Sequence, residues 1–302
     1  MLQRAIVLLP LVMMVGCVGQ PVESSHLPYQ PGQKGLLTYR EDMHYGESTE
    51  FGGLDMPFEV KPGKDGTIEI AVGVSRFYTG NTYKGKTEMH DSEGPRRTGR
   101  SADAQVDAEF ARNAAAMKTL RFSVTVDAGG RVIAFTGKGE PYEAIKEVPA
   151  SQRDMVELAV AGVYRTIIEE SLVYLPIGKS VQAGTQWRVH RPVVFPLHQF
   201  GIGMLTGCAA VSEDSTCRVE SVRTTLGGQV ATIRFQGERR AVAEYESAGA
   251  PTGNWLKTEG QIEFNLDTGE LVRHRIVSHV RMADPGNPWK GEFIDTMAIK
   301  RR

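Results

Sequence analysis

The feature that most constrains the fold is a strict alternation of apolar and polar residues, which recurs along the chain. In the clearest case, residues 120–127 alternate between Leu, Phe or Val and Arg, Ser, Thr or Asp; the chain then turns at Gly129-Gly130 and returns through 132–135. Successive side chains of a strand point to opposite faces, so this pattern predicts a β-hairpin with one buried face. Similar patterns predict hairpins at 217–235 and 262–282.

Other segments complete this expectation. Apolar and β-branched residues bounded by turns predict strands at 36–40, 58–61 and 67–78. The strongest helix signal runs over 151–175, starting from a capping-box-like Ser151 and stopping before Pro176. Its apolar stripe consists of Val156, Val160, Val163, Ile167 and Tyr174.

Such a helix must bury its stripe against a sheet, and this sets the expected architecture. The predicted fold class is mainly β, a β-rich α+β body (35–302) of curved antiparallel sheet in two halves. The first half spans 35–148, the second spans 176–302, and the helix packs between them. A weaker helix is expected at 104–118.

The N-terminus predicts an export signal. One basic residue, Arg4, precedes an apolar block at 5–15, and Gly16-Cys17 closes it. This is the pattern of a signal peptide spanning 1–16. A membrane-spanning helix needs about 20 apolar residues, so the block is too short for one.

The ending Met14-Val15-Gly16-Cys17 resembles the lipobox of bacterial lipoproteins. That resemblance implies a diacylglycerol thioether on Cys17, cleavage after Gly16 and acylation of the new amino terminus. Val18 after the cysteine is similar to sorting patterns that favour the outer membrane, facing the periplasm. Residues 17–34, rich in Pro, Gln, Gly and Ser, are then expected to form a flexible tether.

Charge and cysteine content narrow the function further. The chain has 35 Lys plus Arg and 36 Asp plus Glu, a balance that argues against a nucleic-acid partner. In an oxidising compartment, Cys208 and Cys217 would form a disulfide worth near 3 kcal/mol for a loop of about ten residues. A metal site is the alternative, but the spacing is not Cys-x-x-Cys.

Sequence motifs predict no catalytic residue, no metal ligand and no cofactor. None of the His-Glu-x-x-His, Gly-x-Ser-x-Gly or phosphate-loop patterns occurs. On the last predicted hairpin, Arg273, Arg275 and Arg281 share one parity and could form an anion-binding stripe. The preferred interpretation is a solvated strand face on which Glu263 pairs across the strands.

A wider resemblance covers most of the chain after Cys17. The features that carry it are, in order, His90-Asp91-Ser92, the 124–132 hairpin, the central helix, Leu175-Pro176, Val181, Gly184, Trp187 and Asp267-Thr268-Gly269. Their order is similar to that of an uncharacterised family of exported bacterial β-rich proteins, and this resemblance implies a two-halved β fold without an assigned activity.

The resulting functional expectation is a non-enzymatic envelope lipoprotein, held at a membrane by the lipid on Cys17, that binds an apolar ligand or an envelope protein. A ligand carrier should have an apolar cavity under the 151–175 helix. The alternative is a hydrolase with an unrecognised active site, in which two or more of His90, His190, His198 and a carboxylate would converge within hydrogen-bond reach. A third possibility is a structural module of a larger assembly.

Overall fold

The computed structural model describes residues 22–24, 27–94, 104–147, 149, 162, 164–196, 208–241, 255–282 and 289–301. The predicted signal peptide with Cys17, the predicted helix start at Ser151, and His198 lie outside these residues. Among the described residues, no helix has the length and apolar character that crossing a membrane would need.

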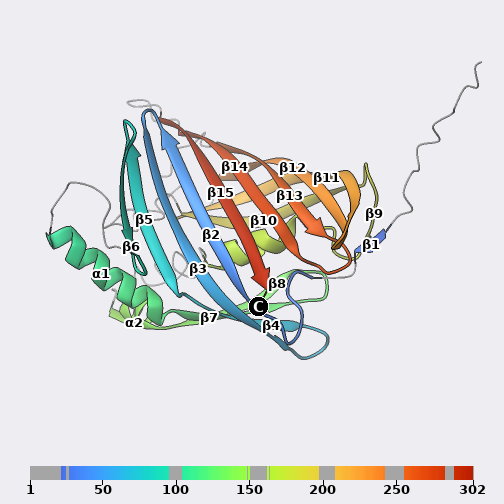
Figure 1. Cartoon of the computed structure of the whole chain (residues 1–302), viewed down its shortest axis with the longest axis horizontal. Helices are drawn as coiled ribbons and strands as arrows, with labels where there is room; N and C mark the ends of the chain where they lie inside the picture. The colour runs from blue at the N-terminus through green and yellow to red at the C-terminus, as the bar shows by residue number, and fades with distance from the viewer. Residues whose placement is uncertain are drawn as a thin grey trace, which may run out of the picture.

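The fold is mainly β and is built around one open antiparallel sheet of thirteen strands (Figure 1). From one edge to the other, its main path runs through β10 (Gln186–Pro196), β11 (Cys208–Thr225), β12 (Gly228–Ala241), β13 (Trp255–Asn265), β14 (Leu271–Met282), β15 (Trp289–Arg301), β2 (Lys34–Tyr45), β3 (Ser48–Pro62), β4 (Ile68–Gly73), β7 (Arg121–Val126) and β8 (Val132–Lys138).

The two halves expected from the sequence meet inside this sheet. Strand β2 of the first half pairs with β15 of the second over ten residue pairs, starting from Glu292 opposite His44. All three predicted hairpins are confirmed, as β7–β8, β11–β12 and β13–β14. The fold-class prediction is therefore confirmed, and the halves share one continuous sheet.

The sheet branches at β3, and this corrects the single strand predicted at 67–78. Strand β4 pairs with the C-terminal part of β3, whereas β5 (Arg76–Tyr83) pairs with its N-terminal part. The chain changes position at Val74-Ser75, where the Ser75 amide donates a hydrogen bond to the carbonyl of Asp55. Strand β6 (Lys86–Asp91) then extends this branch beside β5.

A helix lies on the inner face of the sheet, which we define as the face that carries the apolar core. Residues 164–173, here called the core helix, form the described part of the predicted 151–175 helix. Strands β2 and β15 pass in front of it in Figure 1. The ring of Tyr164 packs against that of Phe122 on β7, with 5.3 Å between the ring centroids. Tyr174, just after the helix, stacks on Phe235 of β12, with 3.8 Å between the centroids. The core helix therefore bridges strands that lie far apart in the sheet order.

Two further helices in the described part of the chain pack at the border of this core, through Met117 and Tyr142. The predicted weak helix is confirmed as α1 (Ala104–Thr119), which packs near β5, and α2 (Glu140–Glu147) was not expected from the sequence. The Glu140 amide donates to the hydroxyl of Thr119, so the end of α1 and the start of α2 are joined by a hydrogen bond.

Part of the predicted tether is folded. Strand β1 (Val22–Ser24) pairs with β9 (Lys179–Val181), and Tyr29 is 1% exposed in the core. The Tyr29 ring packs edge-on against Phe58, and its hydroxyl lies 2.9 Å from that of Ser171. Burial of this tyrosine fixes the segment, so the body begins before the predicted boundary at residue 35.

The predicted disulfide is wrong. Cys208 and Cys217 belong to the same strand, β11, in which nine residue steps of about 3.3 Å separate them by roughly 30 Å. A disulfide requires Cα atoms within about 7 Å. Cys217 is a free, buried thiol, and burial raises its pKa to about 12. The sequence pattern suggested a loop where the chain continues as one long strand.

Candidate functional site

A group of charged side chains is buried between the core helix and the end of the sheet that contains β10, β11 and β12. The strand register places Arg191 opposite Glu213 and Glu213 opposite Arg239, so an acidic residue lies between two basic ones on three neighbouring strands. The core helix supplies Glu170 from above. These four residues, Glu170, Arg191, Glu213 and Arg239, are here called the ion cluster.

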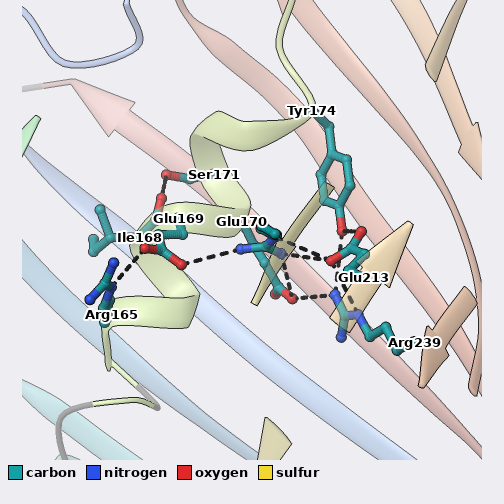
Figure 2. A network of polar contacts seen from close by, with 9 residues as sticks. Arg165, Ile168, Glu169, Glu170, Ser171, Tyr174, Glu213 and Arg239 are labelled. Carbon is teal, nitrogen blue, oxygen red and sulfur yellow. Dashed lines mark hydrogen bonds and ion pairs between the residues drawn. The ribbon is translucent and has the colours of Figure 1, made fainter. Parts of the chain in front are cut away.

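Both arginines contact both glutamates. Figure 2 shows Glu170, Glu213 and Arg239 pointing toward one another. Arg191 lies 3.1 Å from Glu213 and 3.6 Å from Glu170. Arg239 lies 3.3 Å from Glu213 and donates to Glu170 at 2.7 Å. Because the side chains are at most 10% exposed, these charges are neutralised by one another and not by water.

Hydroxyl groups complete the shell around Glu213. The Tyr174 hydroxyl donates to one of its carboxylate oxygens at 2.5 Å, and Ser215 donates to the same oxygen at 2.7 Å. At the border of the cluster, Glu169 contacts Arg191 at 3.4 Å and accepts from Arg165 at 2.7 Å. Figure 2 shows these contacts continuing along the core helix.

The electrostatic consequence is that the cluster keeps its charges. Burial alone would raise the pKa of Glu213, but Arg239, Arg191 and two hydroxyl donors outweigh it and lower the pKa to about 2. Burial likewise opposes the charge on the arginines, yet the glutamates raise the pKa of Arg191 and Arg239 above the usual range. Burial raises the pKa of Tyr174, whose hydroxyl stays protonated as a donor.

His274 lies next to the ion cluster but, unlike its four members, is uncharged. Its ring lies 6.3 Å from that of Tyr174, and the side chain is 1% exposed, which confirms the sequence prediction that it faces the core. Burial and the nearby charge of Arg191 lower its pKa to about 3, only partly offset by the backbone of Glu170. His274 is therefore a neutral imidazole at physiological pH.

Chemically, the ion cluster is suited to holding the helix in one orientation. A carboxylate shared by two arginines and two hydroxyls has no oxygen left to accept a proton from a substrate near neutral pH. General acid–base residues instead have pKa values near the working pH. Among the described residues, no three potential ligands come close enough to hold a metal ion.

The histidines singled out in the sequence are not brought together. His90, on β6, lies 3.5 Å from Asp107 of α1 beside a pocket of about 240 Å³. His190, on edge strand β10, is exposed and lies 3.8 Å from Asp214. Strand β6 belongs to the branch that leaves the sheet at β3, and β3 is the seventh strand after β10 in the sheet order. His90 and His190 therefore do not form one described site.

The ion cluster was missed in the sequence. In the sequence, Glu169 and Glu170 are adjacent helical residues that face about 100° apart; Glu170 contacts both arginines of the cluster, whereas Glu169 contacts Arg191 at its border. A usable signal was charge on the apolar parity of a strand, because Glu213 shares parity with Cys217 and Val219. A charged residue can also occupy the apolar parity where the end of a strand extends beyond the core, so this pattern alone did not identify the cluster.

The outer face of the same strands also carries charge. Arg273 and Arg275 of the predicted stripe lie in a trough of about 840 Å³, whereas the side chain of Arg281 is not among those described. Glu263 lies opposite Arg273 as predicted, but its carboxylate accepts a hydrogen bond from Arg223 at 3.0 Å.

Fold and site together define a β-rich protein whose open sheet is fastened to a helix by buried ions. No protein-family model matches the chain, and no curated protein matches it. A solved structure of lipovitellin, described in terms of lipid–protein interactions, is similar with a TM-score of 0.48 and 9% identity, over 90% of this chain and 25% of that one. This chain thus spans about a quarter of that protein, and so weak a likeness carries no argument about function.

Proposed function

We propose that this protein is a lipid-anchored, non-enzymatic binding protein of the bacterial envelope, whose inner sheet face holds an apolar ligand or an envelope partner. The observation that carries the proposal is the state of the buried charges. The charged side chains of the ion cluster pair with one another, and the pKa values of Glu213 and Arg191 lie far from neutral pH. Such a cluster serves as a scaffold for the apolar face around it.

The long strands of the inner face are compatible with a binding role. The described part of the core helix, residues 164–173, rises about 15 Å at 1.5 Å per residue. Strands β11 and β3, of 18 and 15 residues, are about 60 Å and 50 Å long at 3.3 Å per residue. These ten residues lie along only part of the strands' length.

The choice of ligand follows from the residues that line the inner face. One apolar cluster reaches from Val124 on β7 to Phe235 on β12 and includes Met56 and Ile262 on the strands between them; the protein itself buries these side chains in this structure. Burial of apolar area is worth about 25 cal/mol per Å², so a long aliphatic chain is the class of ligand that we propose for a protein with so extended an apolar cluster.

The ligand experiment is native mass spectrometry of the full-length protein purified from its own cells, with organic extraction of the same sample. We expect an adduct of lipid mass that the extract releases. A fluorescent fatty acid titrated into the extracted protein should then bind, and a heat-unfolded sample should not bind it. An adduct-free protein that also leaves the fatty acid unbound would refute the ligand proposal.

The anchor is tested separately. Cys17→Ser should move the protein from the membrane fraction to the soluble fraction, because a lipid thioether needs the sulfur atom. Cys217→Ser changes a buried thiol in the body and should leave the protein in the membrane fraction. If Cys17→Ser stays with the membrane, the anchor is wrong even when a ligand is found.

A further inference from the structure

The outer trough defines a second binding surface, on the opposite face of the sheet from the core helix. It crosses β10 to β14, and four arginines line it, Arg218, Arg234, Arg273 and Arg275, together with two glutamates, Glu220 and Glu259. Each alternates with buried neighbours such as Cys217 and Ile276, which point to the inner face. The sheet itself therefore separates this trough from the ion cluster.

The strand register aligns the trough in one row. Gln186, Arg218, Arg234, Gln261 and Arg275 are successive partners across five strands. Neighbouring strands lie about 4.8 Å apart, so about 14 Å separates Arg218 from Arg275. A site of this length is suited to an extended ligand.

Most of the positive charge in the trough is not used within the protein. Arg234 is paired with Glu220 at 2.8 Å. Across the part of the chain that the structure describes, Arg218, Arg273 and Arg275 have no such ion pair. A planar guanidinium binds carboxylates and phosphates through two parallel hydrogen bonds, so these three arginines fit acidic groups on a ligand.

The other side chains indicate what lies between those acidic groups. Gln186, Gln236 and Gln261 line the trough, and each amide can both donate and accept a hydrogen bond, as hydroxyl groups do. The aromatic residue at the trough, Phe235, is 2% exposed, so it offers no ring face for stacking nucleobases. Exposed large apolar residues that could anchor a protein partner lie elsewhere, at Tyr83, Ile133, Leu226 and Val272.

The basic character is local to the trough. Further along the same face, a groove of about 660 Å³ is lined by Asp214, Glu238 and Glu259 together with Lys257. A generally basic face would attract any polyanion, whereas here an acidic groove borders the arginine row. We propose that the outer trough binds an acidic polysaccharide, with carboxylate or phosphate groups on the arginines and sugar hydroxyls on the glutamine amides.

The test uses full-length protein in detergent micelles, with binding measured by microscale thermophoresis. The probes are polygalacturonate for carboxylate, phosphorylated dextran for phosphate, neutral dextran and duplex DNA of equal charge. We expect one or both acidic polysaccharides to bind, neutral dextran not to bind, and DNA to bind at least about tenfold more weakly. The acidic probe that binds more tightly identifies the acidic group.

Arg218→Gln combined with Arg275→Gln should weaken binding at least tenfold, since a charge-assisted contact is worth about one factor of ten or more. The matched control is Arg223→Gln, an exposed arginine of the same strand β11 outside the trough, which should change affinity less than about twofold. Equal losses in both variants, no binding of either acidic polysaccharide, or equal binding of DNA would each overturn the proposal. Unchanged thermal unfolding of both variants keeps the comparison interpretable, and none of these results depends on an apolar ligand.

Discussion

Replacing Glu213 by glutamine tests whether the ion cluster stabilises the fold. The substitution keeps the side-chain shape and an oxygen for the Tyr174 hydroxyl, and it removes one negative charge. Arg239, 1% exposed, and Arg191, 10% exposed, are then left with Glu170 as their buried counter-charge. Breaking a buried ion pair by removing one partner costs about 3–5 kcal/mol. We therefore expect Glu213→Gln to lower the free energy of unfolding by that amount.

The control is Glu220→Gln on the same strand, which removes the pairing with Arg234 at an exposed position. Exposed pairs contribute about 0–1 kcal/mol, so this change should be small. Urea unfolding followed by tryptophan fluorescence suits the comparison, because urea does not screen charge. With an m-value of about 3 kcal/mol/M, the midpoint of Glu213→Gln should fall by about 1–1.7 M. Equal, small shifts for both variants would show that the reasoning is wrong.

The same variant has an expected pH dependence. The folded pKa of Glu213 is about 2 and lies below the ordinary value of 4.5, so its stabilising effect is complete above pH 4.5 and is lost as the pH falls toward 2. The difference in unfolding free energy between parent and Glu213→Gln should therefore shrink over that interval. A difference that stays constant from pH 7 to 3 would contradict the assignment of the charge to Glu213.

Three further predictions concern single side chains. Tyr174→Phe keeps the stacking on Phe235 and removes the hydrogen bond to Glu213, so urea unfolding should show a loss of about 1–3 kcal/mol. His274 has a folded pKa of about 3, below the unfolded value, so its contribution to stability is complete above pH 6.5 and declines as the pH falls. The parent protein should therefore lose about 3 kcal/mol more unfolding free energy than His274→Leu between pH 6.5 and pH 4. An acid unfolding profile that is the same in both proteins would refute this. In unfolded, unreduced protein, Cys208 and Cys217 should both react with iodoacetamide, whereas a mass that changes only after reduction would restore the disulfide.

Local patterns predicted those parts of the fold that local physics determines. The alternation at 120–127 and the turn after it produced the β7–β8 hairpin, because period-two burial and glycine turn chemistry act within a few residues. The branch of the sheet at β3 was not predictable, since it depends on which strand meets which half of a 15-residue partner. Similarly, Cys208 and Cys217 matched a loop pattern because the sequence between them is polar, as the outer face of a long strand also is.

The candidate site was harder to predict because it is assembled by register. Glu213 lies 22 positions from Arg191 and 26 from Arg239, and only the alignment of β10, β11 and β12 places the three side by side. The trough arises in the same way, from Arg218 and Arg275 on strands that are not neighbours. Arg273 and Arg275 share one strand, so their common face could be predicted from the sequence. The trough residues on the other strands gave no such pattern.

Alternation along β11 makes the two proposed roles separable. Glu213, Ser215 and Cys217 point to the inner face, while Thr216 and Arg218 point to the outer trough. A change at an inner position acts on the core helix and hence on unfolding, whereas a change at an outer position meets solvent and should act on binding alone. Glu213→Gln should therefore lower stability without changing polysaccharide affinity at pH 7 and low urea, and the Arg218 and Arg275 double variant should do the reverse. If Glu213→Gln weakened polysaccharide binding while the protein remained folded, the sheet would be transmitting a change between its faces, and the two roles would have to be treated as one.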